Sequence, residues 1–252
     1  MPEWTTRAVW GVWVEALAGV VEAHRRLGEV LAGLGDGQVR EPSLLPGWTR
    51  GHVLAHLNDA ARARARVVEH ALRGEAVALW EPGERDAIIE AAAGRTADEH
   101  RADHAEHSRR LEEVWAGVED WDAPVLGGEV DLVPAVFTRW REVWIHLVDL
   151  DLGVTPAEWG VEFSCHVVDV LRPRLPGGWG LRATDVERDW GRAEERVAEV
   201  RAAEVRGLEA GARVVGAVRD LAAWLAGREP VAPLAGPLPP LGPWPAYPAR
   251  RQ

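Results

Sequence analysis

The stretch that most constrains the fold of this chain is Arg141–Asp149, with the sequence REVWIHLVD. Glu142 and His146 lie four residues apart, so a helix would place both side chains on one face, one turn apart. Arg139 and Asp149 extend this polar stripe, and apolar residues flank it on both sides (Val136, Trp140, Val143, Trp144 and Leu147). A helix with this pattern is usually buried, and buried carboxylates and imidazoles are costly unless they are paired or bound to a metal. The stretch therefore predicts half of a metal site, with a buried Glu–His pair or a solvated neighbouring pair as the alternatives.

A second pair of polar residues has the same spacing. His52 and His56 follow Thr49, which has the residue type of a helix N-cap, and the turn at Pro46–Gly47 precedes that cap. Two histidines four residues apart on a helix can bind a divalent metal when another ligand comes from elsewhere. The glutamate that follows the first histidine in zinc proteases is missing here. The alternative is a pair of histidines on the surface or in the first helical turn.

Four long segments have the apolar periodicity of helices, at 5–34, 49–74, 96–118 and 134–150. The segment 75–95 between the second and third is irregular, with a short helix expected at 86–93. Such a pattern predicts a four-helix bundle, in which metal sites are built from inward-facing side chains on opposed helices. In a bundle of this kind, His56 could meet the Glu142/His146 pair.

Two further groups of candidate residues have simpler interpretations. His100, His104 and His107 share one stripe of the third segment among charged neighbours, which favours a mostly solvated stripe over a metal site. Cys165 is the single cysteine of the chain, so no internal disulfide can form. Its amphipathic surroundings favour a buried small hydrophobic residue over a catalytic thiol.

The character of the sequence changes after Gly153. A fifth helix is expected at 155–173, a strand at 179–185, further strands at 196–207 and 212–216, and a helix at 220–228. Eight of the 17 prolines follow at 230–252, which predicts an extended tail that either wraps the surface or stays disordered. We therefore expect an α+β protein with a four-helix bundle at 1–153, a small α/β domain at 154–229 and a proline-rich tail at 230–252.

Composition excludes several classes of protein. The net charge of −11 disfavours binding to nucleic acid. No apolar run is long enough to span a bilayer, and the N-terminus has no pattern of a secretion signal. We expect a cytoplasmic protein that forms a monomer or a homodimer. The chain contains no lysine, and no serine or cysteine in it has the context of a catalytic nucleophile.

Three stretches together resemble one family, the mycothiol-dependent maleylpyruvate isomerases, which belong to the DinB-like metal-binding bundles. Leu45–Leu57 (LPGWTRGHVLAHL) resembles the signature of their second helix, and Arg141–Gly153 (REVWIHLVDLDLG) that of their fourth. Val214–Arg228 (VVGAVRDLAAWLAGR) resembles the end of their C-terminal domain. The stretches occur in the family's order and spacing, although Trp144 and Leu147 replace residues that are smaller or more polar in the family.

The resemblance implies roles for particular residues. The family binds zinc with one histidine of the second helix and with a glutamate and a histidine of the fourth, which correspond here to His56, Glu142 and His146. His52 would then lie beside the site or serve as a substitute ligand, and Asp149 would orient a ligand or the helix. Arg228 matches an arginine that would hold a substrate carboxylate, with the alternative that it only caps carbonyl groups at the end of its helix.

The resemblance also implies an activity. Zinc, or another divalent metal, would activate a low-molecular-weight thiol such as mycothiol for addition to a small electrophilic substrate. In the isomerase that substrate is maleylpyruvate, in which thiol addition allows rotation about the former double bond before elimination. An S-transferase would release the adduct instead. The same scaffold could also serve a biosynthetic tailoring or detoxifying enzyme, or a metal-binding protein without catalysis.

Overall fold

The chain divides into two compact units after Gly153. A computed structural model describes residues 4–75, 77–119, 121, 124–125, 130–191 and 213–245. The first unit contains four long helices, α1 (Trp4–Ala32), α3 (Arg50–Ala71), α5 (Ala97–Ala116) and α6 (Leu132–Asp149). It also contains the short helices α2 (Asp36–Val39) and α4 (Glu84–Ala92) and a small hairpin of β1 (Pro124–Val125) and β2 (Val130–Asp131).

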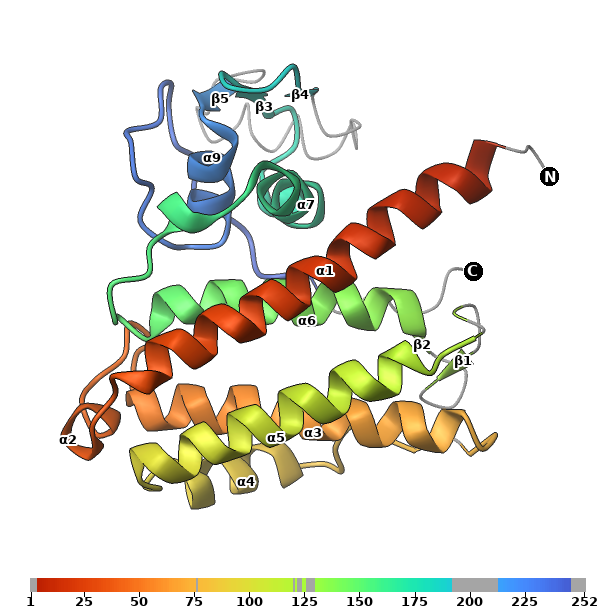
Figure 1. The fold of residues 1–252 in the computed structure, drawn as a ribbon. Helices are drawn as coiled ribbons and strands as arrows, with labels where there is room; N and C mark the ends of the chain where they lie inside the picture. Colours follow the sequence, from red (N-terminus) through yellow and green to blue (C-terminus); the bar gives the residue numbers. More distant parts are fainter. Residues whose placement is uncertain are drawn as a thin grey trace. The chain divides into compact units, whose positions relative to one another are not determined.

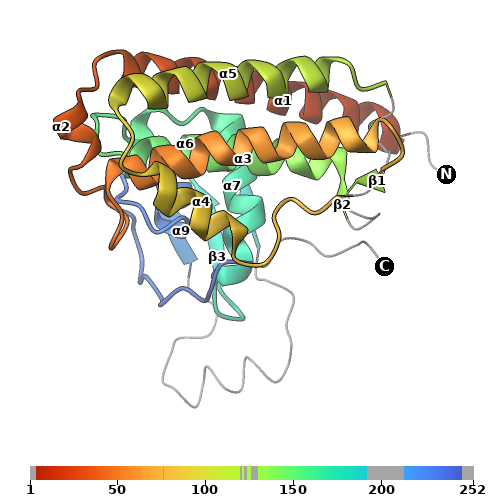
Figure 2. The ribbon, with the colours of Figure 1, turned by 90° about the horizontal axis from the view of Figure 1, so that it is seen from below.

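The four long helices form a bundle (Figures 1 and 2). Both α1 and α3 pack against α5 and α6, and α4 covers α3. Together with the small three-stranded sheet of the second unit, this bundle confirms the predicted α+β fold. The predicted positions of the four helices and of the short helix at 86–93 are confirmed within a few residues.

Local sequence explains where α3 and α5 begin and why α3 can lie close to α4. Thr49 caps α3 by accepting a hydrogen bond from the backbone N–H of His52, and Thr96 caps α5 in the same way with Glu99. Gly51 allows the first turn of α3 to lie on the end of α4, because a Cβ atom there would lie 2.0 Å from the carbonyl oxygen of Ala93.

The predicted solvated stripe on α5 is wrong for two of its three histidines. His100 and His104 are buried, whereas His107 is partly exposed. His104 donates from Nε2 to the carbonyl oxygen of His24 (2.9 Å), and the hydroxyl of Ser108 lies 3.2 Å from its Nδ1. Because α5 packs against both α1 and α3, its buried face is wider than the charged neighbours of these histidines suggested.

The second unit starts differently from the prediction. Thr155 caps only a 3₁₀ turn, η2 (Pro156–Glu158), and the expected fifth helix begins after Gly160 as α7 (Val161–Leu171). Gly160 has an extended conformation, so it separates the two segments. A second 3₁₀ turn, η3 (Arg172–Arg174), follows α7 directly. Cys165 lies on α7 and is buried, as predicted.

A three-stranded sheet completes the second unit, with the order β4-β3-β5. β3 (Gly180–Ala183) pairs antiparallel with β4 (Asp189–Trp190) and parallel with β5 (Arg213–Gly216). Helix α9 (Val218–Leu225) packs against α7, β3 and β5. The strand predicted at 196–207 lies outside the described residues.

The proline-rich segment wraps the second unit as far as residue 245. The buried carboxylate of Asp220 accepts hydrogen bonds from the backbone N–H groups of Val231 (2.8 Å) and Ala232 (3.2 Å). Ala235 then forms a β-bridge with Val215, and the N–H of Gly242 bonds to the carbonyl oxygen of Arg174. All of these bonds use non-proline residues of the segment, since proline has no backbone N–H to donate. Among the described helices, none combines the length and apolarity needed to cross a membrane.

The burial of His104 predicts that stability depends on pH. Burial lowers the pKa of His104 to about 4, although the hydrogen bond to the His24 carbonyl opposes the shift. Between this value and the unfolded value, the unfolded chain binds more protons, so acid favours unfolding. Lowering the pH from 7 to 5 should reduce the free energy of unfolding by about 2 kcal/mol through this residue. Urea denaturation at both pH values should show this dependence reduced by that amount in His104→Gln, which retains a donor for the carbonyl. An unchanged dependence would contradict the interpretation.

Candidate metal centre

The bundle brings together the three residues expected to bind zinc. His56 comes from α3, whereas Glu142 and His146 come from successive turns of α6. The Nε2 atom of His56 lies 3.4 Å from Oε1 of Glu142. The rings of His56 and His146 have centroids 5.0 Å apart and are nearly perpendicular. All three side chains are largely buried, so they form one polar cluster inside the bundle.

Two buried arginines hold the carboxylate of Glu142. Nη1 of Arg64 and Nη1 of Arg139 each lie 3.0 Å from Oε2. Burial alone would raise the pKa of Glu142, but Arg64, His56 and Arg139 together hold it well below its usual range. Glu142 is therefore ionised at neutral pH. Both arginines contact its Oε2, and its Oε1 lies near His56 and also accepts a hydrogen bond from Nη2 of Arg64 (3.3 Å).

Burial favours the neutral imidazole at His56. Burial lowers the pKa of His56, and the hydrogen bond to Glu142 opposes this shift only in part. A metal binds the neutral form of histidine and the ionised form of glutamate. Both residues are therefore in the protonation state that a metal ligand needs.

Asp149 orients His146. Its buried carboxylate accepts a hydrogen bond from Nδ1 of His146 at 2.8 Å. This bond places the ring proton on Nδ1 and leaves the lone pair on Nε2. Carboxylate–histidine pairs of this kind hold ligand histidines in many metal sites.

His52 does not join this cluster. Its Nδ1 lies 2.7 Å from the hydroxyl of Thr49, within the cap of α3, and its Nε2 lies 3.6 Å from Glu90. The ring instead stacks on Trp48, which also contacts the ring of His56. Trp48 therefore lies against both His52 and His56.

Sequence reasoning missed two arginines of this region and the partners of a third. Arg64 lies eight residues after His56, two helical turns along the same face, so its spacing could have revealed it. Arg139 was recognised as part of the polar stripe, but its partners were not. Nη2 of Arg85, on α4, lies 3.4 Å from Nδ1 of His56, and the Arg85 guanidinium lies 6.0 Å from the ring centre of Trp48. No local pattern connects α4 to this cluster.

The donor atoms fit zinc by their chemistry. Two imidazoles and one carboxylate form a common ligand set of catalytic zinc sites, which keep a further position open. Across the described part of the chain, no group of three His, Cys, Asp or Glu side chains is spaced closely enough to enclose a metal ion. His56, Glu142 and His146 have the right ligand types, but their side chains would need to move closer to one another to coordinate a metal.

Arg228 belongs to the second unit. It directly follows Gly227, whose φ of 73° ends the helical segment of α9. Its guanidinium donates to the carbonyl oxygen of Ala226 and lies 6.0 Å from the ring centre of Trp244. The contact with Ala226 is of the kind expected if Arg228 caps its helix.

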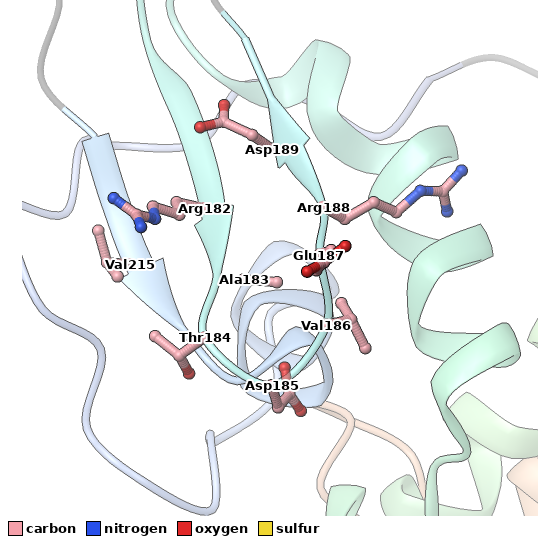
Figure 3. A pocket seen from close by; sticks show the side chains of 9 residues that line it. All are labelled: Arg182, Ala183, Thr184, Asp185, Val186, Glu187, Arg188, Asp189 and Val215. Carbon is pink, nitrogen blue, oxygen red and sulfur yellow. The ribbon is translucent and has the colours of Figure 1, made fainter.

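A hollow on the surface of the second unit contains none of the predicted site residues. It lies along β3, the β3–β4 turn and β4, and Figure 3 shows the side chains around it. The carboxylate of Asp185 in this turn accepts a hydrogen bond from the backbone N–H of Val218, at the start of α9. That contact gives the turn a structural role.

Comparison with known proteins identifies the family. The family model described as the mycothiol maleylpyruvate isomerase N-terminal domain matches residues 20–151. A crystal structure of the mycothiol-dependent maleylpyruvate isomerase has the same fold, with a TM-score of 0.76, 22% sequence identity, and coverage of 92% of this chain and 97% of that one. A histidine-to-alanine mutant of that enzyme gives the same values. No protein with a curated description matches the chain. Because the family model spans more than half of the sequence and includes His56, Glu142 and His146, the chain belongs to the mycothiol maleylpyruvate isomerase family.

Proposed function

We propose that this protein is a zinc-dependent enzyme that activates a low-molecular-weight thiol, mycothiol or a similar molecule, for addition to a small electrophilic substrate. The isomerisation of maleylpyruvate is the reference reaction. The observation that carries the proposal is the convergence of His56, Glu142 and His146 from α3 and α6, with Asp149 behind His146. We expect the protein to act in the cytoplasm as a monomer or a homodimer.

Each side chain of the cluster has a role in this proposal. His56, Glu142 and His146 would hold zinc, or another divalent metal, and zinc when bound supplies the positive charge that lowers the pKa of a thiol. Asp149 keeps the Nε2 lone pair of His146 available. Arg64 and Arg139 keep Glu142 ionised, and Trp48 covers one side of His56.

Among the described side chains of this cluster, none is a thiol or an amine that could act as a strong nucleophile. The single cysteine, Cys165, is buried on α7, and the chain contains no lysine. An external thiol therefore suits a site whose side chains bind, orient and neutralise charge. The absence of a thiol or amine from the cluster supports a reaction in which an added thiol is the nucleophile and the protein positions the reactants.

A turnover assay tests the thiol requirement. Protein stripped of metal and reloaded with zinc should convert maleylpyruvate to fumarylpyruvate only when mycothiol is present, and His146→Ala should abolish the conversion. His107→Ala, which alters a partly exposed histidine outside the cluster, is the control and should retain activity.

The products distinguish the candidate activities. Stoichiometric consumption of the thiol into a stable adduct would identify an S-transferase on the same scaffold. Turnover of another substrate without a thiol would indicate a tailoring or detoxifying enzyme and would contradict the proposed thiol chemistry. Zinc binding without any turnover would identify a metal-binding protein.

For Arg228, we propose that its guanidinium binds a carboxylate of the substrate. Arg228→Met should then raise the KM for maleylpyruvate by about 10-fold or more, since a hydrogen bond to a charged group contributes about 1.5–3 kcal/mol. Arg174→Met is a matched control, because Arg174 also donates to a helix-end carbonyl and lies over the ring of Trp244. Equal KM values for the two variants would show that Arg228 only caps its helix.

A further inference from the structure

A chain of hydrogen bonds leads from the candidate zinc ligand Glu142 through the interior of the bundle. Arg139 is fully buried, with 0% of its surface exposed. Its Nη1 donates to Glu142 and to the carbonyl oxygen of Leu57 (2.9 Å), and its Nε donates to Nε2 of His24 at 3.0 Å. His24 lies on α1, so the chain passes from α6 to a second helix.

His24 extends the chain to α5. Its Nδ1 lies 2.7 Å from Oε1 of Glu112, and the imidazole is 3% exposed. The His104 ring packs edge-on against it, with centroids 6.1 Å apart. Glu112 is partly exposed and ends the chain near the surface of the bundle.

The donors and acceptors of this chain determine the form of His24. A guanidinium group can only donate hydrogen bonds, so Nε2 of His24 must accept from Arg139. The ring proton therefore lies on Nδ1, where the carboxylate of Glu112 accepts it. His24 consequently presents a lone pair to Arg139 only as the neutral imidazole with its proton on Nδ1, and Glu112 selects that form.

Arg139 depends strongly on its partners. Burial lowers its pKa to about 10, so it remains charged at neutral pH inside the bundle. No described residue accepts a hydrogen bond from its Nη2, so the bonds from Nε and Nη1 determine its orientation. Removing the acceptor on His24 would leave a second buried donor unpaired, which costs free energy unless the guanidinium turns away.

We propose that His24 and Glu112 are positioning residues of the candidate zinc centre, acting through Arg139 on the carboxylate of Glu142. The inference rests on the proposed function. Arg139 holds Oε2 of Glu142, while Oε1 lies near His56 and accepts a hydrogen bond from Nη2 of Arg64 (3.3 Å). Arg64 contacts both oxygens of Glu142, so loss of His24 should weaken zinc binding without abolishing it.

Zinc affinity, measured by competition with a chromophoric chelator, tests this inference. His24→Phe keeps a ring of similar size but removes the acceptor, and should weaken zinc binding about 10–100-fold, the range observed for residues that orient metal ligands. His24→Gln can still accept from Arg139 through its amide oxygen and should restore affinity to within a few-fold of the wild type. Glu112→Ala should weaken binding less than His24→Phe does.

A control separates positioning from general stability. Leu111→Ala removes a fully buried apolar side chain beside Glu112, so it should destabilise the bundle while leaving zinc affinity unchanged. Equal zinc affinities for the wild type, His24→Phe and His24→Gln would overturn the inference while leaving the zinc centre intact. A parallel loss in Leu111→Ala would also overturn it, since stability would then explain the effect. A wild type that binds no zinc would refute the proposed function and this inference together.

Discussion

The burial of one carboxylate, that of Glu142, organises the first unit of this protein. An ionised carboxylate inside a bundle is costly unless its charge is neutralised and its oxygens accept hydrogen bonds. Arg64 from α3 and Arg139 from α6 neutralise it, and His56 completes its surroundings. These partners constrain the packing of α3 against α6, and Arg139 extends the constraint to α1. The same constraint brings two histidines and a glutamate together.

The four-helix bundle was predictable from sequence because its signals are local. Apolar periodicity and the caps at Thr49 and Thr96 depend on residues within one helix. The fifth helix was predicted too long, because Thr155 and Pro156 form a good helix start and the break at Gly160 was overlooked. The histidines of α5 were assigned to solvent because their charged neighbours concealed a face that two other helices bury.

The candidate site was only partly predictable. The spacing of Glu142 and His146 indicated a shared face, and the family resemblance added His56. The spacing of His52 and His56 indicated that both could bind a metal, but the ring of His52 bonds to Thr49, the N-cap of α3. The partners of Arg139 on α1 and α3 are distant in sequence, and so is Arg85, so only the folded chain brings them together.

The most direct test of this account is the location of zinc in crystals of the zinc-loaded protein. Anomalous diffraction at the zinc edge should show one ion between α3 and α6, with Nε2 of His56 and Nε2 of His146 at about 2.0–2.1 Å and an oxygen of Glu142 at about 2.0–2.2 Å. The third histidine of the region, His52, should remain in the cap of α3. An ion bound elsewhere, or none at this cluster at saturating zinc, would contradict the account.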